Sequence, residues 1–299
     1  MDTNQIIQQF QFEMQSNGIT PPKNILADGA LHRFYIDGDK KSSKNGWYCL
    51  YLDNIPCGVF GSWKKGNYFK WCSKSKNLMT GSERNQQIEK VKEACKIRDE
   101  MKLKEQNEAS SRAEDLWYSY RAAKPDHLYL VKKLISVFCA RQSGKCLVLP
   151  IVDIDEKIWS LQYISETGDK FFLSNGAIKE HFIPIQIRSG EKRILICEGF
   201  ATGATLAQKH PDVSVIAACN AGNLKSVATN IRFQVPTTEI VICADDDRQN
   251  PENPGVNKGR IAAIAASALF AKPKWPEGSP ISLKDYNDLD CWLQGAYHA

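Results

Sequence analysis

Three consecutive carboxylates follow an apolar run in the stretch VICADDDRQN, residues 241–250. Asp245, Asp246 and Asp247 repel one another at this spacing, so the cluster costs free energy unless a cation lies on it. A second apolar run, RILICEG, delivers Glu198 just before a glycine. Carboxylate oxygens are the ligands that Mg²⁺ and Mn²⁺ prefer, with water completing the coordination shell. The four acids therefore predict a divalent-metal site.

Strands and helices alternate in the part of the chain that carries these acids. Apolar runs at 193–199, 213–222 and 239–247 predict strands, and the segments 200–210, 222–232 and 256–271 predict helices. This alternation is typical of a parallel sheet covered by helices on both faces. Functional groups of such sheets collect at the carboxyl ends of the strands.

Side chains alternate along an extended strand, so Asp245 and Asp247 are expected on one side and Asp246 on the other. A further acidic stretch, KDYNDLD, places Asp285 and Asp288 near the carboxyl end of the chain. These two residues either orient the metal ligands or cap the final helix. Acids at strand ends also often only cap helices or lie in solvent, but two strands ending in acids favour the metal site.

Four ordered motifs carry a family resemblance: ILICEGFATGATL, ACNAGNL, VICADDDRQNPENPGVNKGR and KDYNDLD. Together they resemble the Toprim domain, an α/β fold shared by bacterial DnaG-type primases, topoisomerases and some nucleases. In detail they are similar to the Toprim primases of plasmids and phages, including the TraC-like conjugative ones. The segment 144–177 is similar to the one preceding Toprim in such primases, so the resemblance covers about residues 125–290.

The resemblance implies roles for the acids. Glu198 acts near the reaction centre as metal ligand or acid/base, and Asp245 and Asp247 bind divalent metal, which makes these three the expected catalytic residues. Asp246 is shared with many relatives and is added to the metal set. The implied reaction is the synthesis of short RNA primers on single-stranded DNA from ribonucleoside triphosphates, by in-line phosphoryl transfer with Mg²⁺ or Mn²⁺.

Basic residues are candidates for nucleotide or template binding. By resemblance, Lys170 aligns with a basic residue that faces the active site of these primases. Arg141 and Lys145 flank a preceding strand and are candidate phosphate contacts, with a solvated surface charge as the alternative. Lys258 and Arg260 fall at the start of a predicted helix, whose free N–H groups favour phosphate. No P-loop motif is present, which excludes a P-loop ATPase or fused helicase.

The sequence predicts four segments. Residues 1–75 form a small β-rich domain with a short amphipathic helix and an antiparallel meander, and residues 76–123 form a charged helical connector. This helix is expected to be capped by Ser82 and is a candidate for a break near Ser110 and Ser111. Residues 124–190 form a basic α+β primase subdomain, and residues 191–299 form the Toprim catalytic domain.

Aromatic residues and lysines interleave in the β-rich domain. Trp63, Lys64, Lys65 and Lys70 are candidate contacts to single-stranded DNA, because exposed aromatic rings stack bases and lysines follow the backbone. The alternative is that these aromatic residues form the core of a small sheet. Three cysteines in the same region also leave a zinc site open, without a fourth ligand at finger-like spacing.

Composition narrows the function classes. The net charge is +5, the hydrophobic content is 42%, and no apolar run approaches the ~18 residues that cross a bilayer. Ten cysteines without a secretory signal predict reduced thiols in a cytoplasmic location. The family resemblance implies that this cytoplasm is that of a bacterial host. A replicative helicase is a candidate partner. Two alternatives to a primase stay open: a Toprim metal-dependent nuclease, and a non-catalytic replication factor that binds single-stranded DNA.

Overall fold

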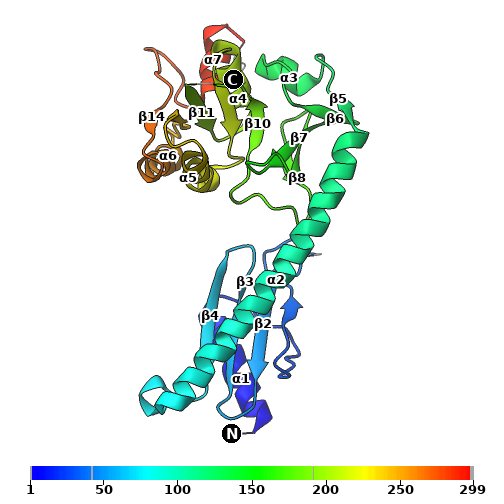
Figure 1. Ribbon diagram of the computed structural model, residues 1–299, viewed down its shortest axis with the longest axis vertical. Coiled ribbons are helices and arrows are strands. Elements are labelled where there is room, and N and C mark those ends of the chain that lie inside the picture. The colour runs from blue at the N-terminus through cyan, green and yellow to red at the C-terminus, as the bar shows by residue number, and fades with distance from the viewer. Residues whose placement is uncertain (1, 42, 191, 297–299) are drawn as a thin grey trace. The chain divides into compact units, whose positions relative to one another are not determined.

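The computed structural model describes residues 2–41, 43–190 and 192–296, and the chain groups into two compact units (Figure 1). The first unit covers residues 1–104 and the second residues 105–299. Their boundary falls inside helix α2, Gly81–Ser119. The first unit contains the predicted segment 1–75, and the second contains the predicted segments 124–190 and 191–299. The predicted connector, residues 76–123, is divided between the two units.

The first unit is built on an antiparallel sheet of strand order β1-β2-β3-β4, as the predicted meander requires. Its elements are α1 Thr3–Ser16, β1 His32–Phe34, β2 Gly46–Tyr51, β3 Cys57–Ser62, β4 Asn67–Cys72, the 3₁₀ turn η1 Lys76–Leu78, and the first part of α2.

Helices cover both faces of this sheet. The predicted apolar stripe of α1 is buried, and Phe10 packs edge-on against Phe60 and Trp71. On the other face, Trp47 belongs to a core cluster with Val91 of α2. Most aromatic residues of the meander are thus packed in two small hydrophobic cores. A short sheet needs such large side chains to bury enough apolar area.

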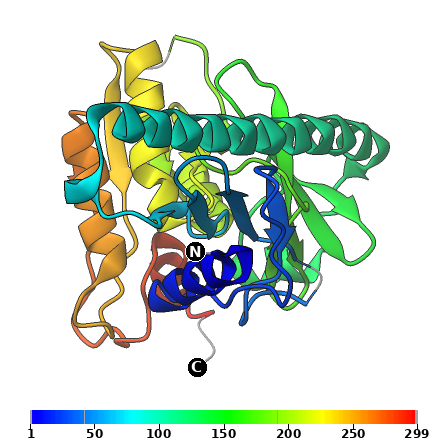
Figure 2. The same cartoon turned by 90° about the horizontal axis from the view of Figure 1, so that it is seen from below.

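Helix α2 is a single continuous helix (Figures 1 and 2). It starts one residue before the predicted cap, because Thr80 and Glu83 form the reciprocal capping pair: Thr80 Oγ1 accepts from Glu83 N, and Glu83 Oε2 accepts from Thr80 N. The candidate break at the serine pair is absent. Ser110 Oγ instead donates to the carbonyl of Ile158. No helix in the described ranges is long and apolar enough to cross a membrane.

The second unit contains two sheets. The first is antiparallel, in the order β5-β6-β7-β8-β9. Its strands and the helix among them are β5 Arg121–Ala122, α3 Leu128–Lys133, β6 Arg141–Ser143, β7 Cys146–Val152, β8 Ile158–Ser165 and β9 Lys170–Phe172.

The second sheet has the order β10-β12-β11-β13-β14 and is parallel except at β10, which pairs antiparallel with β12. Its elements are β10 Ile183–Gln186, β11 Arg193–Cys197, α4 Phe200–Lys209, β12 Ser214–Ala217, η2 Ala221–Asn223, α5 Leu224–Gln234, β13 Glu239–Cys243, α6 Pro254–Ala265, β14 Leu269–Ala271 and α7 Tyr286–Leu293. The helix predicted over 256–271 is wrong at both ends. It starts earlier, at Pro254, and its last residues form the edge strand β14.

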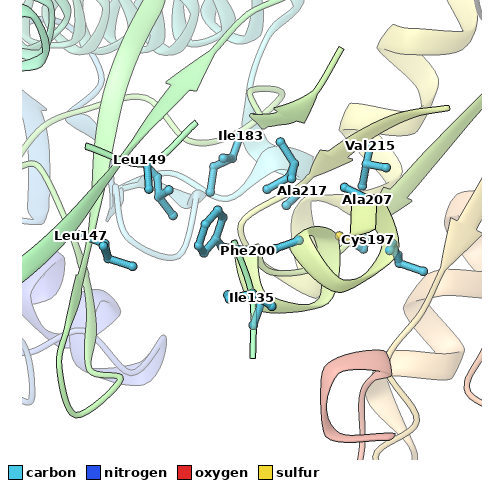
Figure 3. Packing of buried hydrophobic residues seen from close by; sticks show 14 of the residues in the cluster. Ile135, Leu147, Leu149, Ile183, Cys197, Phe200, Ala207, Val215 and Ala217 are labelled. Atoms are coloured by element: carbon cyan, nitrogen blue, oxygen red, sulfur yellow. The ribbon is translucent and has the colours of Figure 1, made fainter. Parts of the chain in front are cut away.

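The parallel sheet is buried on both faces. Leu195 of β11 lies in a cluster with Phe200 of α4, whereas Ile194 and Ile196 lie in a cluster with α5 and α6. Figure 3 shows Phe200 between residues of β7 and residues of the parallel sheet. The two sheets of the second unit therefore share one core, which fixes β9 relative to the ends of the parallel strands.

Candidate active site

The ends of β11 and β13 position the predicted acids. The two strands are parallel neighbours, and their last residues, Cys197 and Cys243, are register partners. Glu198 follows β11 directly, and Asp245 follows β13 after one alanine. Because the strands end level, both carboxylates emerge at one edge of the sheet and line the same cavity.

This cavity has a volume of about 320 Å³ and a polar lining. Acidic side chains come from three places in the chain, the ends of β11 and β13 and the start of α7. Lysines come from α3, β9 and the segment before α7. The charged lining residues are Glu198, Asp245, Asp285, Asp288, Lys132, Lys133, Lys170 and Lys284.

Asp245 has a strongly perturbed carboxyl group. Burial, together with the charges of Asp285, Glu198 and Asp247, raises its pKa to about 8 against the lowering effect of Lys284. Its Oδ1 atom is buried and has no hydrogen-bond partner among the described residues. A buried carboxylate oxygen without a donor is costly in a folded protein and points to a cationic partner.

Glu198 and Asp247 lie near the carboxyl group of Asp245, and their charges act on it. Burial raises the pKa of Glu198, the backbone N–H of Ala221 opposes that shift, and the charge of Asp247 adds to it. Asp247 Oδ2 accepts a hydrogen bond of 3.0 Å from the backbone N–H of Gly255. A Cβ atom at Gly255 would lie 2.6 Å from the carbonyl oxygen of Asp245, so α6 approaches the acidic loop as closely as only glycine allows.

Asp285 has one of the two roles that the sequence left open, that of a helix cap. It is the N-cap of α7, where its side chain accepts a 2.7 Å hydrogen bond from Asp288 N, and it also lines the cavity. Burial and the charge of Asp288 raise its pKa. Asp288 itself is occupied, because its oxygens accept from Lys133 Nζ and from the backbone N–H of Lys284. Only Asp285 of this pair therefore joins the cluster around Asp245.

The donor set fits a divalent cation that keeps part of its water shell. Within residues 2–41, 43–190 and 192–296, no three His, Cys, Asp or Glu side chains enclose a ready-made metal site. Mg²⁺ does not need such a cage, because it is commonly held by one or two carboxylates and by substrate phosphates. The unpartnered oxygen of Asp245, with Glu198 and Asp247 beside it, supplies hard ligands of that kind.

Comparison with known protein families identifies the domain that contains the parallel sheet. A family model described as "Toprim domain" matches residues 193–292. These residues form a Toprim domain. The match begins at β11 and includes every acid of the site, from Glu198 to Asp288.

Similarity to curated proteins extends beyond the Toprim domain. The chain is 30% identical over 270 residues to a DNA primase TraC from Escherichia coli, which covers 88% of this chain and 25% of that protein. A second Escherichia coli DNA primase TraC is 28% identical over 285 residues, covering 91% and 20%. The chain thus spans a quarter or less of the curated relatives that it matches.

Among solved structures, the DnaG primase catalytic domain bound to single-stranded DNA aligns with a TM-score of 0.43 at 14% identity. The alignment covers 65% of this chain and 77% of that one.

Asp246 faces away from the cavity of the Toprim domain, as strand alternation predicts. It is 1% exposed, and its oxygens accept from Asn253 Nδ2, Lys272 Nζ and Trp275 Nε1 at 2.7–3.0 Å. Burial alone would raise the pKa of Asp246, but these donors outweigh it and lower the pKa. Its inclusion in the metal set is not supported by this arrangement, because its lone pairs are already used to fix the loop.

Lysines bring positive charge to the acids of the Toprim domain. Lys170 lines the cavity, and its Nζ is 3.5 Å from a Cβ built on Gly199. Its charge lowers the pKa of Glu198 against the raising effect of burial. Lys284 and Lys133 also line the cavity. Sequence reasoning missed both, although Lys284 directly precedes Asp285, because only the acids of KDYNDLD were considered.

The helix start predicted to bind phosphate is occupied by the protein itself. Asn253 caps α6 and accepts from Val256 N, and Asp247 takes the N–H of Gly255. Lys258 is exposed in the second turn of α6, and the guanidinium of Arg260 lies over the ring of Phe270 at 5.4 Å. Neither lines the cavity, so the structure gives no support to their predicted role.

Arg141 is structural in this fold. Its Nη1 donates to the carbonyl oxygens of Trp117 and Tyr120 at 2.6 and 3.0 Å, and its guanidinium lies over the Trp117 ring. A cation at this position stabilises the carbonyls of the last turn of α2 and of the residue that follows the helix. Lys145 is 85% exposed and lies 3.9 Å from Glu166. The structure gives no support to the phosphate contacts predicted for Arg141 and Lys145, because Nη1 of Arg141 is used in this cap and neither residue lines the cavity.

We expect Arg141→Met to lower the free energy of unfolding by about 1–3 kcal/mol, because it leaves these two carbonyls without their charged donor. Its affinity for nucleoside triphosphates should not change. Urea denaturation and nucleotide titration measure the two effects, with Lys145→Met as the matched control. Weaker nucleotide binding at unchanged stability would restore the original assignment.

Two of the four candidate DNA contacts of the first unit, Trp63 and Lys64, make contacts within the protein. Arg33 lies over the Trp63 ring at 3.9 Å, and Lys64 pairs with Asp39 at 2.6 Å. Lys65 is exposed in the turn between β3 and β4, whereas Lys70 lies on β4. Burial raises the pKa of the Cys49 thiol in this unit to about 12, and no zinc cluster occurs among the described residues.

Proposed function

We propose that this chain is a DNA primase that synthesises short RNA primers on single-stranded DNA. The observation that carries the proposal is the convergence of Glu198, Asp245 and Asp285 with Lys170 and Lys284 at the carboxyl edge of the Toprim sheet. The sequence similarity to DNA primases over most of the chain supports it. The proposed activity is that of a chain which spans 25% and 20% of the length of these two relatives.

The charges of the cavity suit nucleotidyl transfer. Bound Mg²⁺ or Mn²⁺ would supply charge compensation for the triphosphate and its pyrophosphate leaving group. Asp245 would hold the cation, with Asp247 beside it. Glu198, whose pKa is raised by burial, is the proposed ligand or proton acceptor next to the attacking hydroxyl. Lys170 and Lys284 would hold phosphate oxygens by charge-assisted hydrogen bonds.

The similarity to TraC primases supports a narrower biological setting. We propose a role in plasmid or phage replication or transfer, with ribonucleoside triphosphates as substrates and a replicative helicase as a candidate partner. The reaction would take place in the cytoplasm of a bacterial host, where the template and the nucleotides occur together.

One assay distinguishes this proposal from the two alternatives. Purified protein is incubated with single-stranded DNA, labelled ribonucleoside triphosphates and MgCl₂, with a parallel reaction in EDTA. We expect short new RNAs that require the metal. Degraded template without new RNA would indicate a nuclease, and intact template without RNA would indicate a binding protein.

A further inference from the structure

A large groove lies in the first unit, between the edge strand β4 and the first turns of α2. Its volume is about 980 Å³. Its lining includes Lys70, one of the four DNA contacts predicted from the sequence, but not Trp63, Lys64 or Lys65. β4 contributes Tyr68 and Lys70, η1 contributes Lys76, and α2 contributes Arg84, Ile88 and Lys92. The remaining walls come from the short connection between β4 and α2 and from the end of α1.

The groove is strongly basic. Among the described residues its lining holds five cationic side chains and one acid, Glu13. Two of the cations are neutralised nearby, since Lys74 pairs with Glu83 and Lys92 pairs with Glu89. The other three, Lys70, Lys76 and Arg84, form no ion pair within the described parts of the chain. A concave surface with this excess of positive charge attracts a polyanion.

An aromatic ring stands among these charges. Tyr68 is 41% exposed on β4, where the large rings of neighbouring strands are buried. Lys70 Nζ lies 5.8 Å and Arg98 Cζ 5.4 Å from its ring centroid. Ile88 of α2 is 44% exposed and lines the same groove. An exposed ring between cations is the arrangement on which single-stranded bases stack while their phosphates are neutralised.

Protection of the sheet edge does not explain the cluster. Lysines on an edge strand discourage pairing with another chain, which accounts for Lys70 on β4. Lys76 and Arg84 lie outside the strand, on η1 and α2, and line the same groove from its other side. A peptide strand added to β4 would use main-chain hydrogen bonds and would not need them.

We propose that this groove binds single-stranded nucleic acid, with Lys70, Lys76 and Arg84 on its phosphates and Tyr68 stacked on a base. The inference deepens the proposed function, on which it rests, by naming which part of the first unit holds a template strand. Its affinity is independent of bound metal and of nucleotide.

The test measures fluorescence anisotropy of a labelled 20-nucleotide oligothymidylate with the full chain, in EDTA and without nucleotides, from 50 to 300 mM salt. We expect Lys70→Ala/Lys76→Ala/Arg84→Ala to weaken binding about tenfold or more at 150 mM salt. The slope of log affinity against log salt should fall by about 2, since three phosphate contacts are lost. Tyr68→Ala should weaken binding about fivefold or more with an unchanged slope, and Tyr68→Phe should restore it.

The matched control is Lys41→Ala/Lys44→Ala/Lys65→Ala, which removes the same charge from exposed lysines of the same unit outside the groove. Circular dichroism and thermal unfolding establish that each variant is folded, and Lys70→Arg/Lys76→Arg/Arg84→Lys keeps the charge if the alanine variant is not. Equal losses in the groove and control variants, or none in either, would overturn the proposal. If the groove bound peptides instead, the groove variant and the control variant would have the same affinity for DNA.

Primer synthesis by the wild-type chain separates this proposal from the proposed function. If primers form but the groove variant binds DNA like the control, the groove assignment fails and the primase stands. If no primers form but the groove variant alone loses affinity, the groove stands and the polymerase assignment fails.

Discussion

Asp245→Asn is expected to reduce primer synthesis by about 10³-fold or more while making the metal-free protein more stable. Loss of activity follows because a neutral amide cannot compensate a cation next to the triphosphate, and preorganised charge supplies much of the rate in such reactions. The gain in stability follows because the wild-type carboxylate is buried, lacks a donor for Oδ1, and is surrounded by other acids.

The stability effect of Asp245→Asn depends on pH in a defined direction. The folded carboxyl has a pKa of about 8, against an ordinary value of 3.8, so the folded state holds a proton that the unfolded state releases. In EDTA, the free energy of unfolding of the wild type therefore falls as pH rises from about 4 to about 8. The amide has no such titration, so its advantage should grow across this window to about 1–3 kcal/mol.

Urea denaturation in EDTA at pH 5 and pH 8, together with the primer assay, checks both effects. Asp212→Asn, in an exposed turn, is the matched control and should leave activity and stability unchanged. Full activity of Asp245→Asn would remove this carboxylate from the catalytic set.

The adjacent acid should behave in the opposite way. Asp246→Ala is expected to lower the free energy of unfolding by about 2–4 kcal/mol, because it leaves Lys272, Trp275 and Asn253 without their common acceptor in a buried place. The loss should be the same with and without MgCl₂, since the side chain faces away from the cavity. Any loss of activity should follow the loss of folded protein.

Denaturation curves with and without MgCl₂ separate a structural role from a ligand role. Asp246→Asn, which keeps a side-chain oxygen of the same shape, should lose less stability than the alanine variant. If Asp246→Ala kept its stability in EDTA but no longer gained stability from Mg²⁺, the side chain would be a metal ligand after all.

The position of the acids was predictable because strand signals are local. Continuous apolar runs marked β11 and β13, and the end of each run placed Glu198 and Asp245 at one edge of a parallel sheet. The two-residue alternation of strands also separated Asp246 from its neighbours. These inferences needed only the order of residues and the geometry of an extended chain.

The basic partners were less predictable because they depend on tertiary contacts. Arg141 was assigned to phosphate, yet it caps α2 across 24 residues of sequence. Lys133 reaches Asp288 across 155 residues, and no local pattern announces such a pair. The start of α6 was assigned to phosphate from its dipole, but the side chain of Asp247 already takes a backbone donor there. The sequence shows which residues are charged, but only the three-dimensional structure shows which groups they contact.

The close approach of Gly255 to the carbonyl of Asp245 sets unequal limits on change around the acidic loop. Residues 251 and 252 are exposed and line neither of the two pockets next to the acids, so new side chains there should not touch the site. Position 255 has no such freedom, because any added atom would push α6 away from the carboxylates. We therefore expect substitutions at the tip of this loop to be tolerated, in evolution and in protein engineering, and substitutions of Gly255 at the start of α6 to be rejected.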